Sequence, residues 1–267
     1  MRTSPRDRLW APLLAIAIAI ALALAAPLTA TAAESDAASA GVDADYDPWQ
    51  RMNRGIFWFN DRADVYVLEP VAKGWDAVVP ERAENSVSNF FTNLRFPVVM
   101  ANNLLQGKPG AAAIDVGRFM VNSTIGVGGL FDVATLWGLQ RHNEDFGQTL
   151  GVWGVPPGPY LVLPLLGPSN PRDTAGIPVD YVLSVTPLFL SSYWWTGAGI
   201  ISIVNARAQV LDEVQQAKSA SLDYYVFVRN AYYQRRQALV NDQQDDSGTT
   251  PTDDLYDLNA IDDQNSK

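Results

Sequence analysis

The sequence predicts an all-α protein, and three observations support that class. Apolar residues recur at helical spacing in several segments, proline and glycine mark the segment ends, and no long segment alternates as a strand does. Only residues 160–163 have the pattern of a short strand. We detect no internal repeats, so residues 46–240 are predicted to form a single helical domain.

The first 33 residues have the pattern of a secretory signal peptide. Three arginines within the first eight residues precede an apolar run over 13–26, and small residues surround Ala33. The run is shorter than the roughly 20 residues that a spanning helix needs, which disfavours a retained membrane helix. We therefore expect cleavage after Ala33 or Ala32 and export of the chain, whose residues 34–45 form a flexible leader.

The first predicted helix of the domain covers residues 80–96. Pro80 suits its first turn, Glu81 and Glu84 complement the helix dipole, and apolar residues between Val87 and Leu94 share one face.

Three further helices are predicted along the chain. Pro97 starts a short helix that Gly107 ends, and residues 109–121 follow as another. The longest predicted helix is one continuous run over about 204–240, because its apolar residues keep a helical period.

Three apolar stretches are interrupted too often to form ordinary membrane helices. Residues 146–171 hold five glycines and six prolines without one charge, residues 181–206 are also uncharged, and 119–140 carry only Asp132. Irregular backbone at membrane depth is tolerated where it lines a water-filled cavity, although a plain buried core is the alternative. Seven tryptophans fit interfacial belts and favour contact with lipid: Trp49, Trp58, Trp75, Trp137, Trp153, Trp194 and Trp195.

The charge is acidic and concentrated at the C-terminus. Removing residues 1–33, with three Arg and one Asp, changes the formal net charge from −10 to −12. This balance argues against nucleic acid as a partner, which needs a basic face. The segment 241–267, predicted to be disordered, is either a solvated acidic tail or a motif that folds onto a partner through apolar residues such as Leu255 and Ile261.

Signals of catalysis are weak, and we expect no enzyme, no cofactor and no metal. The chain has no cysteine and a single histidine, His142, so a two-histidine metal site cannot form within one chain. No nucleophile elbow or phosphate-binding loop is present. Glu144 and Asp145 beside His142 resemble a catalytic cluster, but neighbouring residues on a polar loop are usually solvated.

Four long segments carry a resemblance to a known family. They are YDPWQRMNRGIFWFND (46–61), VSNFFTNLRFPVVMANNLLQGK (87–108), GRFMVNSTIGVGGLFDVA (117–134) and EDFGQTLGVWGVPPGPYLVLPLLGPSNPRD (144–173). In this order and over 46–240, the chain resembles the MlaA/VacJ family.

The resemblance implies a fold, a location and a function. The fold would be a single helical disc with an amphipathic central channel, embedded in the inner leaflet of the outer membrane of a Gram-negative bacterium. The function would be retrograde transport that removes mislocalised phospholipids from the outer leaflet and maintains lipid asymmetry. The implied partners are phospholipid, an outer-membrane porin trimer and a periplasmic MlaC-like lipid carrier. The acidic tail, where it acts as a binding motif and not as a solvated end, is the candidate contact for the carrier.

The resemblance also suggests site residues, because a lipid path must accept a charged head group and apolar tails. The candidates for the channel are Asn53, Arg54, Phe57, Phe59, Asn60, Asp61, Asn89, Phe90, Asn93, Arg118 and Asn122; Arg172 and Asp173 are as ambiguous as the last two. Capping and helix-to-helix hydrogen bonds are the alternative role of the polar ones. A structural role in the broken segments is expected for Gly126, Gly128, Gly129, Gly147, Gly151, Gly154, Pro159, Pro164 and Gly167.

The chain departs from the family pattern at the signal cleavage site. The family typically carries a cysteine there for acylation, whereas this site reads TATAAES, so we expect attachment to the periplasmic side of the outer membrane without an acyl anchor. Gln50 and Met52 are milder departures from the expected Glu and Phe. Two alternative functions stay open, a soluble periplasmic phospholipid shuttle, which the missing cysteine suggests, and a porin-docked adaptor. A phospholipase is the least favoured of the functions considered.

Overall fold

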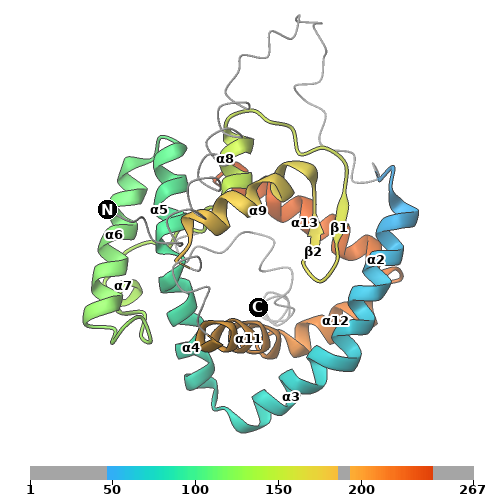
Figure 1. Cartoon of the computed structure of the whole chain (residues 1–267), viewed down its shortest axis with the longest axis horizontal. Coiled ribbons are helices and arrows are strands. Elements are labelled where there is room, and N and C mark those ends of the chain that lie inside the picture. The colour runs from blue at the N-terminus through green and yellow to red at the C-terminus, as the bar shows by residue number, and fades with distance from the viewer. Residues whose placement is uncertain (1–46, 186–192, 243–267) are drawn as a thin grey trace, which may run out of the picture. The chain divides into compact units, whose positions relative to one another are not determined.

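The computed structural model describes residues 47–185 and 193–242, with side chains from residue 196 onward in the second range. Most described elements are helices, so the all-α prediction is confirmed (Figure 1). One small antiparallel hairpin is the exception, and its first strand falls on the predicted strand residues. The leader and the acidic tail beyond residue 242 lie outside the described residues.

A long helical run begins the described chain. It consists of α2 (Gln50–Ala63), the π-helical turn η2 (Asp64–Leu68) and α3 (Glu69–Val78), and it changes direction between α2 and α3 (Figure 1). A π turn inserts an extra residue into the helical ladder, which allows such a bend. Arg207 fixes the turn, because its Nε and Nη2 donate to the two carboxylate oxygens of Asp64 at 2.7 and 3.0 Å.

The next three helices begin and end close to the predicted positions. They are α4 (Glu81–Leu94), α5 (Phe96–Leu105) and α6 (Pro109–Thr124), and a short helix that was not predicted, α7 (Val133–Leu136), follows them. Pro80 has extended backbone angles and directly precedes α4. Gly107 takes a φ of 76°, which glycine adopts without steric cost, and thereby ends the α5 segment before Pro109 starts α6.

The uncharged stretch 146–171 is not one helix, as its glycines and prolines predict. It forms α8 (Phe146–Val152) and a hairpin of β1 (Leu161–Leu163) and β2 (Gly167–Ser169), and it ends where α9 (Pro171–Leu183) begins. In the hairpin Val162 pairs with Pro168. Asp145 and Asn170 cap the two helices, since their side chains accept hydrogen bonds from backbone N–H groups.

Helices α8 and α9 cross at two glycines. A Cβ atom added to Gly176 would lie 2.6 Å from the backbone nitrogen of Gly147, which is closer than atoms in contact can approach. A Cβ on Gly147 would lie 2.7 Å from Asp173 Oδ1. The absence of side chains at this crossing therefore allows the two backbones to touch.

The continuous helix expected over 204–240 is wrong. The segment divides into the end of α11 (Tyr193–Ala208), then α12 (Leu211–Ala220) and α13 (Tyr224–Val240). Ser221 is extended, and the Asp223 carboxylate accepts from the N–H groups of Tyr225 and Val226 at 3.1 and 3.3 Å. This cap starts a new helix, because it satisfies backbone donors that a continuing helix would have bonded internally.

An aromatic core joins the hairpin to α13. Tyr160 and Val162 of the hairpin segment are buried with Tyr225 and Tyr233 of α13, and Phe57 of α2 packs against them. Tyr160 contacts the rings of Tyr225 and Tyr233 at centroid distances of 5.9 and 5.8 Å. The core therefore lies where α2, the hairpin and α13 meet.

Many apolar side chains remain outside this core. Val78, Leu136 and Leu165 are 82%, 83% and 74% exposed. Of the predicted interfacial tryptophans, Trp49, Trp58, Trp137 and Trp153 are exposed, Trp75 is half-buried, and the side chains of Trp194 and Trp195 lie outside the described residues. Within the described ranges, none of the helices combines the length and the hydropathy that crossing a bilayer requires.

Candidate functional site

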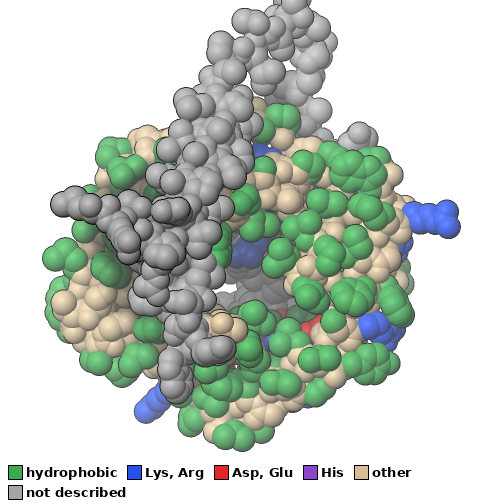
Figure 2. Space-filling model, viewed as in Figure 1, with side chains coloured by type: hydrophobic (Ala, Val, Ile, Leu, Met, Phe, Trp, Pro, Cys, Tyr) green, Lys and Arg blue, Asp and Glu red, His purple; other side chains and the backbone are tan. Residues whose placement is uncertain are grey.

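A cavity of about 860 Å³ lies against α12 and α13. Seen along the same direction as Figure 1, the molecular surface is hollowed in its middle, and Lys or Arg side chains are visible inside the hollow (Figure 2). The apolar lining of the cavity comes mainly from α12 and α13: Val210, Val214, Ala217, Phe227, Val228, Ala231 and Leu239. Its charged and amide lining consists of Arg95, Asn143, Asp145, Glu213, Arg235 and Arg236. The cavity is therefore amphipathic.

One wall of this cavity is fixed by an ion-pair network. Arg236 of α13 donates to both carboxylate oxygens of Asp145 at 2.6 and 3.0 Å, and its Nε lies 2.7 Å from Asp173 Oδ2. Burial opposes ionisation of Asp145, but the bonds from Arg236 and Gln148 hold its pKa at about 2. Tyr232 donates to Asp173 at 2.6 Å, and burial next to that carboxylate raises the pKa of the phenol. The Arg236–Asp145 pair therefore stays charged at neutral pH.

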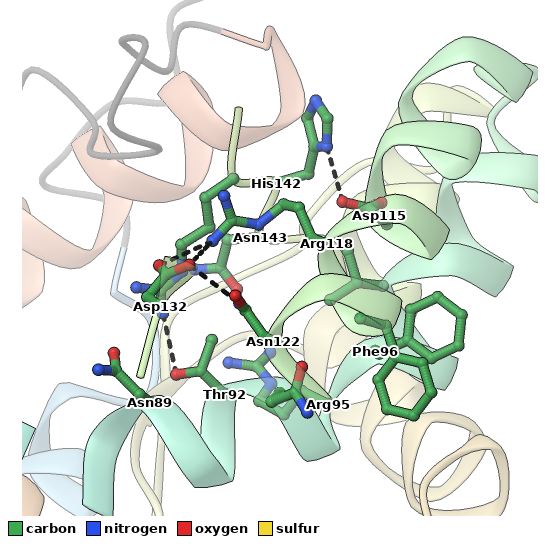
Figure 3. A pocket seen from close by; sticks show the side chains of 14 residues that line it. Asn89, Thr92, Arg95, Phe96, Asp115, Arg118, Asn122, Asp132, His142 and Asn143 are labelled. Atoms are coloured by element: carbon green, nitrogen blue, oxygen red, sulfur yellow. Dashed lines mark hydrogen bonds and ion pairs between the residues drawn. The ribbon is translucent and has the colours of Figure 1, made fainter. Parts of the chain in front are cut away.

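A second, polar cavity of about 50 Å³ lies between α4, α6 and the segment 141–143 (Figure 3). Arg118 donates to both oxygens of Asp132 at 2.9 and 2.8 Å, and Asn122 donates to the same carboxylate at 2.9 Å. His142 Nδ1 lies 2.8 Å from Asp115 Oδ1. Arg95 and Asn143 line this cavity and the larger one. The two cavities therefore adjoin at these residues.

The predicted residues of the first signature hold the hairpin. Asn53 is fully buried; its Nδ2 donates to Tyr160 O at 2.9 Å, and its Oδ1 accepts from Val162 N at 3.0 Å. Asn60 similarly donates to Leu163 O and accepts from Leu165 N at 2.9 and 2.8 Å. Each side-chain amide thus donates to one backbone carbonyl of the hairpin segment and accepts from one backbone N–H, which is the bonding that a neighbouring strand would provide.

The other candidates of that signature contact α12, α13 and their connection. Arg54 pairs with Asp223 at 2.7 Å, Asp61 pairs with Lys218 at 2.8 Å, and Phe57 packs against Tyr225. Phe59 is half exposed. The side chains that line the two described cavities do not include any of the first-signature candidates. Their role in lipid passage stays a prediction.

The remaining candidates gather at the small cavity. Asn89, Asn93, Arg118 and Asn122 all line it, whereas Phe90 contacts the ring of Phe91 edge-on. Arg172 and Asp173 lie on α9, and Asp173 belongs to the network around Arg236. The structure thus brings together candidates from α4 and α6, two helices that α5 separates in the chain.

The expected glycine and proline positions show two kinds of constraint. Positive φ angles occur at Gly128, Gly129, Gly154 and Gly167, and close backbone approach occurs at Gly126 and Gly147. Gly151 faces Arg172 Nη1, which would lie 2.7 Å from an added Cβ. Pro159 is half-buried and Pro164 lies exposed in the hairpin turn.

The possible catalytic cluster of His142, Glu144 and Asp145 does not form in the structure, because each side chain faces a different partner. His142 faces Asp115, Asp145 faces Arg236, and Glu144 faces Gln106 and Lys108 at 2.8 and 3.4 Å. The expectation that these loop residues are merely solvated is wrong for Glu144, which is buried and has a raised pKa because of that burial.

The sequence interpretation missed several residues that line the cavity of about 860 Å³. Arg95, Asn143 and Arg236 were not candidates, and the apolar faces of α12 and α13 were interpreted only as a helical period. A signal for Arg236 was present in the segment RNAYYQRR, which places arginines next to aromatic residues on one predicted helix.

Comparisons with known proteins agree on one family. The family model described as "MlaA lipoprotein" matches residues 45–239. The "Intermembrane phospholipid transport system lipoprotein MlaA" of Escherichia coli (strain K12) is 38% identical over 226 residues, which cover 80% of this chain and 88% of that protein. The protein of the same name from Haemophilus influenzae is 35% identical over 211 residues, 75% of this chain and 82% of that protein.

A relative without an assigned function and a solved structure are also similar. An uncharacterized protein of Rickettsia felis is 36% identical over 196 residues, 73% of this chain and 78% of that protein. A solved structure described as "Structural basis for maintenance of bacterial outer membrane lipid asymmetry" has a TM-score of 0.63 and 38% identity, and the match covers 73% of this chain and 99% of that one. On the family model, the relatives and the fold together, this chain belongs to the MlaA lipoprotein family.

Proposed function

We propose that this chain is the outer-membrane component of a phospholipid transport system, which removes mislocalised phospholipid from the outer leaflet and so maintains lipid asymmetry. The observation that carries the proposal is the amphipathic cavity of about 860 Å³ against α12 and α13. A phospholipid has a charged head group and two apolar tails, so its path needs both apolar and charged walls, and this cavity has both. The named relatives support the same substrate class.

We propose that the exposed apolar side chains contact lipid on the periplasmic side of the outer membrane. Val78, Leu136 and Leu165 are each more than two thirds exposed, and Trp58, Trp137 and Trp153 add exposed aromatic rings. Exposed apolar surface of this extent is typical of membrane or protein contact, and tryptophan favours the interface. Export would use the signal peptide over 1–33.

Two protein partners complete the proposal. A porin trimer would be the neighbour in the membrane, and a periplasmic lipid carrier would receive the phospholipid through the acidic tail 241–267. Truncation after Val240 tests the second part. We expect membrane association to persist and transfer to the carrier to fall; unchanged transfer would make the tail a solvated end.

Complementation tests the transport function directly. A Gram-negative strain that lacks its own member of the family receives this chain, and outer-leaflet phospholipid is quantified alongside the amount of protein in washed outer membranes. We expect outer-leaflet phospholipid to fall to the level of the parent strain. If the protein reaches the membrane but the lipid level stays high, the transport function is contradicted. If a high-salt wash releases the protein with bound phospholipid, the soluble shuttle takes its place.

A further inference from the structure

Arg95 lies where the two cavities adjoin, and its guanidinium group is not bonded to another described residue. Its backbone ends α4 and starts α5: its N–H donates to Thr92 O at 3.0 Å, and its carbonyl accepts from Val98 and Val99 N–H at 3.0 and 3.1 Å. Its side chain is exposed and, among the described residues, makes no hydrogen bond or ion pair. The backbone therefore fixes the base of a guanidinium whose donors remain available.

The carboxylates of the small cavity are already occupied. Each carboxylate oxygen of Asp132 accepts a hydrogen bond from Arg118. Asp115 faces His142 at 2.8 Å and accepts from Asn103 at 2.7 Å. Neither carboxylate forms an ion pair with Arg95 or Arg141 in the described part of the chain. The two arginines thus line the cavity without a salt bridge among the described residues, while the charge of Asp132 acts on Arg141 and that of Asp180 on Arg95 from a longer distance.

Arg141 is the second of these arginines. It donates from Nη2 to the Thr92 hydroxyl at 3.1 Å, on the helix that Arg95 ends. Desolvation and the charge of Arg118 lower the pKa of Arg141, the charge of Asp132 raises it, and the charge of Arg95 lowers it further. Arg95 and Arg141 line the same small cavity, and guanidinium groups with donors that are not used in an ion pair are suited to bind an anion there.

We propose that Arg95 and Arg141, assisted by the Asn143 amide, bind the phosphate group of a phospholipid at the junction of the cavities. The acyl tails then lie along the apolar faces of α12 and α13, beside which Arg95 and Asn143 also stand. The small cavity of about 50 Å³ has room for a few water-sized groups, as one phosphate requires. This assignment rests on the proposed function and adds the group of the lipid that is recognised.

The arrangement also predicts what is not recognised. Guanidinium groups match the oxygens of a phosphate, which all phospholipids share, whereas they give no reason to prefer one esterified alcohol over another. Binding should therefore depend on the phosphate and the tails. A diacylglycerol with the same tails, which lacks the phosphate, should not respond to the arginines.

Binding measurements on the full exported chain, held in amphipol, test the proposal with three probes. The probes are dihexanoyl phosphatidylglycerol, dihexanoylglycerol and inorganic phosphate, all below any micelle concentration. The variants are Arg95→Gln and Arg141→Gln, and Arg95→Lys keeps the charge without the fork. Arg82→Gln is the matched control, because Arg82 is an exposed arginine on α4 that lines neither cavity.

The expected result distinguishes binding at this subsite from a general effect of the positive charge of the protein. Arg95→Gln and Arg141→Gln each weaken phospholipid binding about tenfold or more, the effect of one charge-assisted hydrogen bond, and Arg95→Lys weakens it less. Dihexanoylglycerol binding stays unchanged in all variants, and Arg82→Gln binds both lipids as the parent does. Unchanged far-ultraviolet circular dichroism confirms that each variant is folded.

Three results overturn the subsite. They are equal losses for phospholipid and dihexanoylglycerol, a loss in Arg82→Gln as large as in Arg95→Gln, and inorganic phosphate binding as tightly as the phospholipid, which would make this a site for free anions. A parent chain that binds neither lipid contradicts the proposed function itself, and the subsite with it. If the parent chain binds both lipids and the arginine variants bind the phospholipid as tightly as the parent does, only the subsite is contradicted and the proposed function stands.

Discussion

Arg236 donates two hydrogen bonds to Asp145, from Nη1 to Oδ2 at 2.6 Å and from Nη2 to Oδ1 at 3.0 Å. Asp145 in turn caps α8, because its Oδ1 accepts from Gln148 N at 2.8 Å. One ion pair thus ties α13 to the start of α8 at the wall of the large cavity.

Removing this ion pair should be costly. Arg236→Met leaves Asp145 and Asp173 without their shared cation, and breaking a largely buried pair on one side costs about 3–5 kcal/mol. Chemical denaturation should show a midpoint far below that of the parent chain. Arg51→Met, at an exposed position of α2, is the control and should change little. A parent-like midpoint for Arg236→Met would show that the network does not stabilise the fold.

Glycines 126 and 128 should respond very differently to alanine. A Cβ on Gly126 would lie 2.2 Å from Phe131 O and 2.5 Å from Asn122 O, two backbone atoms that cannot move without disrupting the turn. Gly128 has a φ of 71° but open space around it, so alanine there costs only the left-handed strain of roughly 1–2 kcal/mol. We expect Gly126→Ala to lower the denaturation midpoint more than Gly128→Ala. Equal midpoints would refute the close contact at Gly126.

Stability should rise as the pH falls from about 7 to about 4 because of Asp180. Burial raises its pKa to about 6, although its oxygens accept from Phe146 N–H and from Asn102. The folded state therefore holds this proton more tightly than the unfolded state does, and protonation favours folding in that window by on the order of 2 kcal/mol. Asp145, with a pKa of about 2, affects stability in the opposite direction: its ionised form stabilises the fold, and this contribution is lost only as the pH falls below about 4.

The variant Asp180→Asn isolates this group. Asparagine keeps an acceptor for the Phe146 N–H but does not titrate, so the rise between pH 7 and pH 4 should shrink. Denaturation at several pH values measures the difference, with the exposed Asp212→Asn as control. A rise of the same size in Asp180→Asn would assign the pH dependence to other groups.

Filling the large cavity should impair lipid transport without loss of the protein. Ala231 of α13 lines the cavity, and Ala231→Trp places a bulky ring in the space that the tails would use. Outer-leaflet phospholipid in the complemented strain should rise toward the level without the chain. Ala220→Trp adds the same ring at an exposed position of α12 outside both described cavities, and it should transport normally. Normal transport by Ala231→Trp would exclude this cavity as the lipid path.

The helical class and several helix ends follow from the amino-acid sequence alone. Pro80, Gly107 and Pro109 act on their own neighbours through fixed or permissive backbone angles, so their effects can be predicted locally. The family motifs are also continuous segments of the chain, so the sequence is sufficient to identify the family. The break of residues 204–240 was missed, because the apolar period continues through Asp223 and conceals its role as a cap.

Tertiary packing, in contrast, selects which residues form the cavities. Arg95, Asn143 and Arg236 come from three distant segments, and they meet because ion pairs and helix crossings position their backbones. Packing also places Asn53 and Asn60, expected on a lipid path, against the backbone of the hairpin. A polar side chain on an apolar helix has the same sequence pattern whether it lines a lipid path or bonds a neighbouring backbone. Only the position of its hydrogen-bond partner in the folded chain distinguishes the two roles.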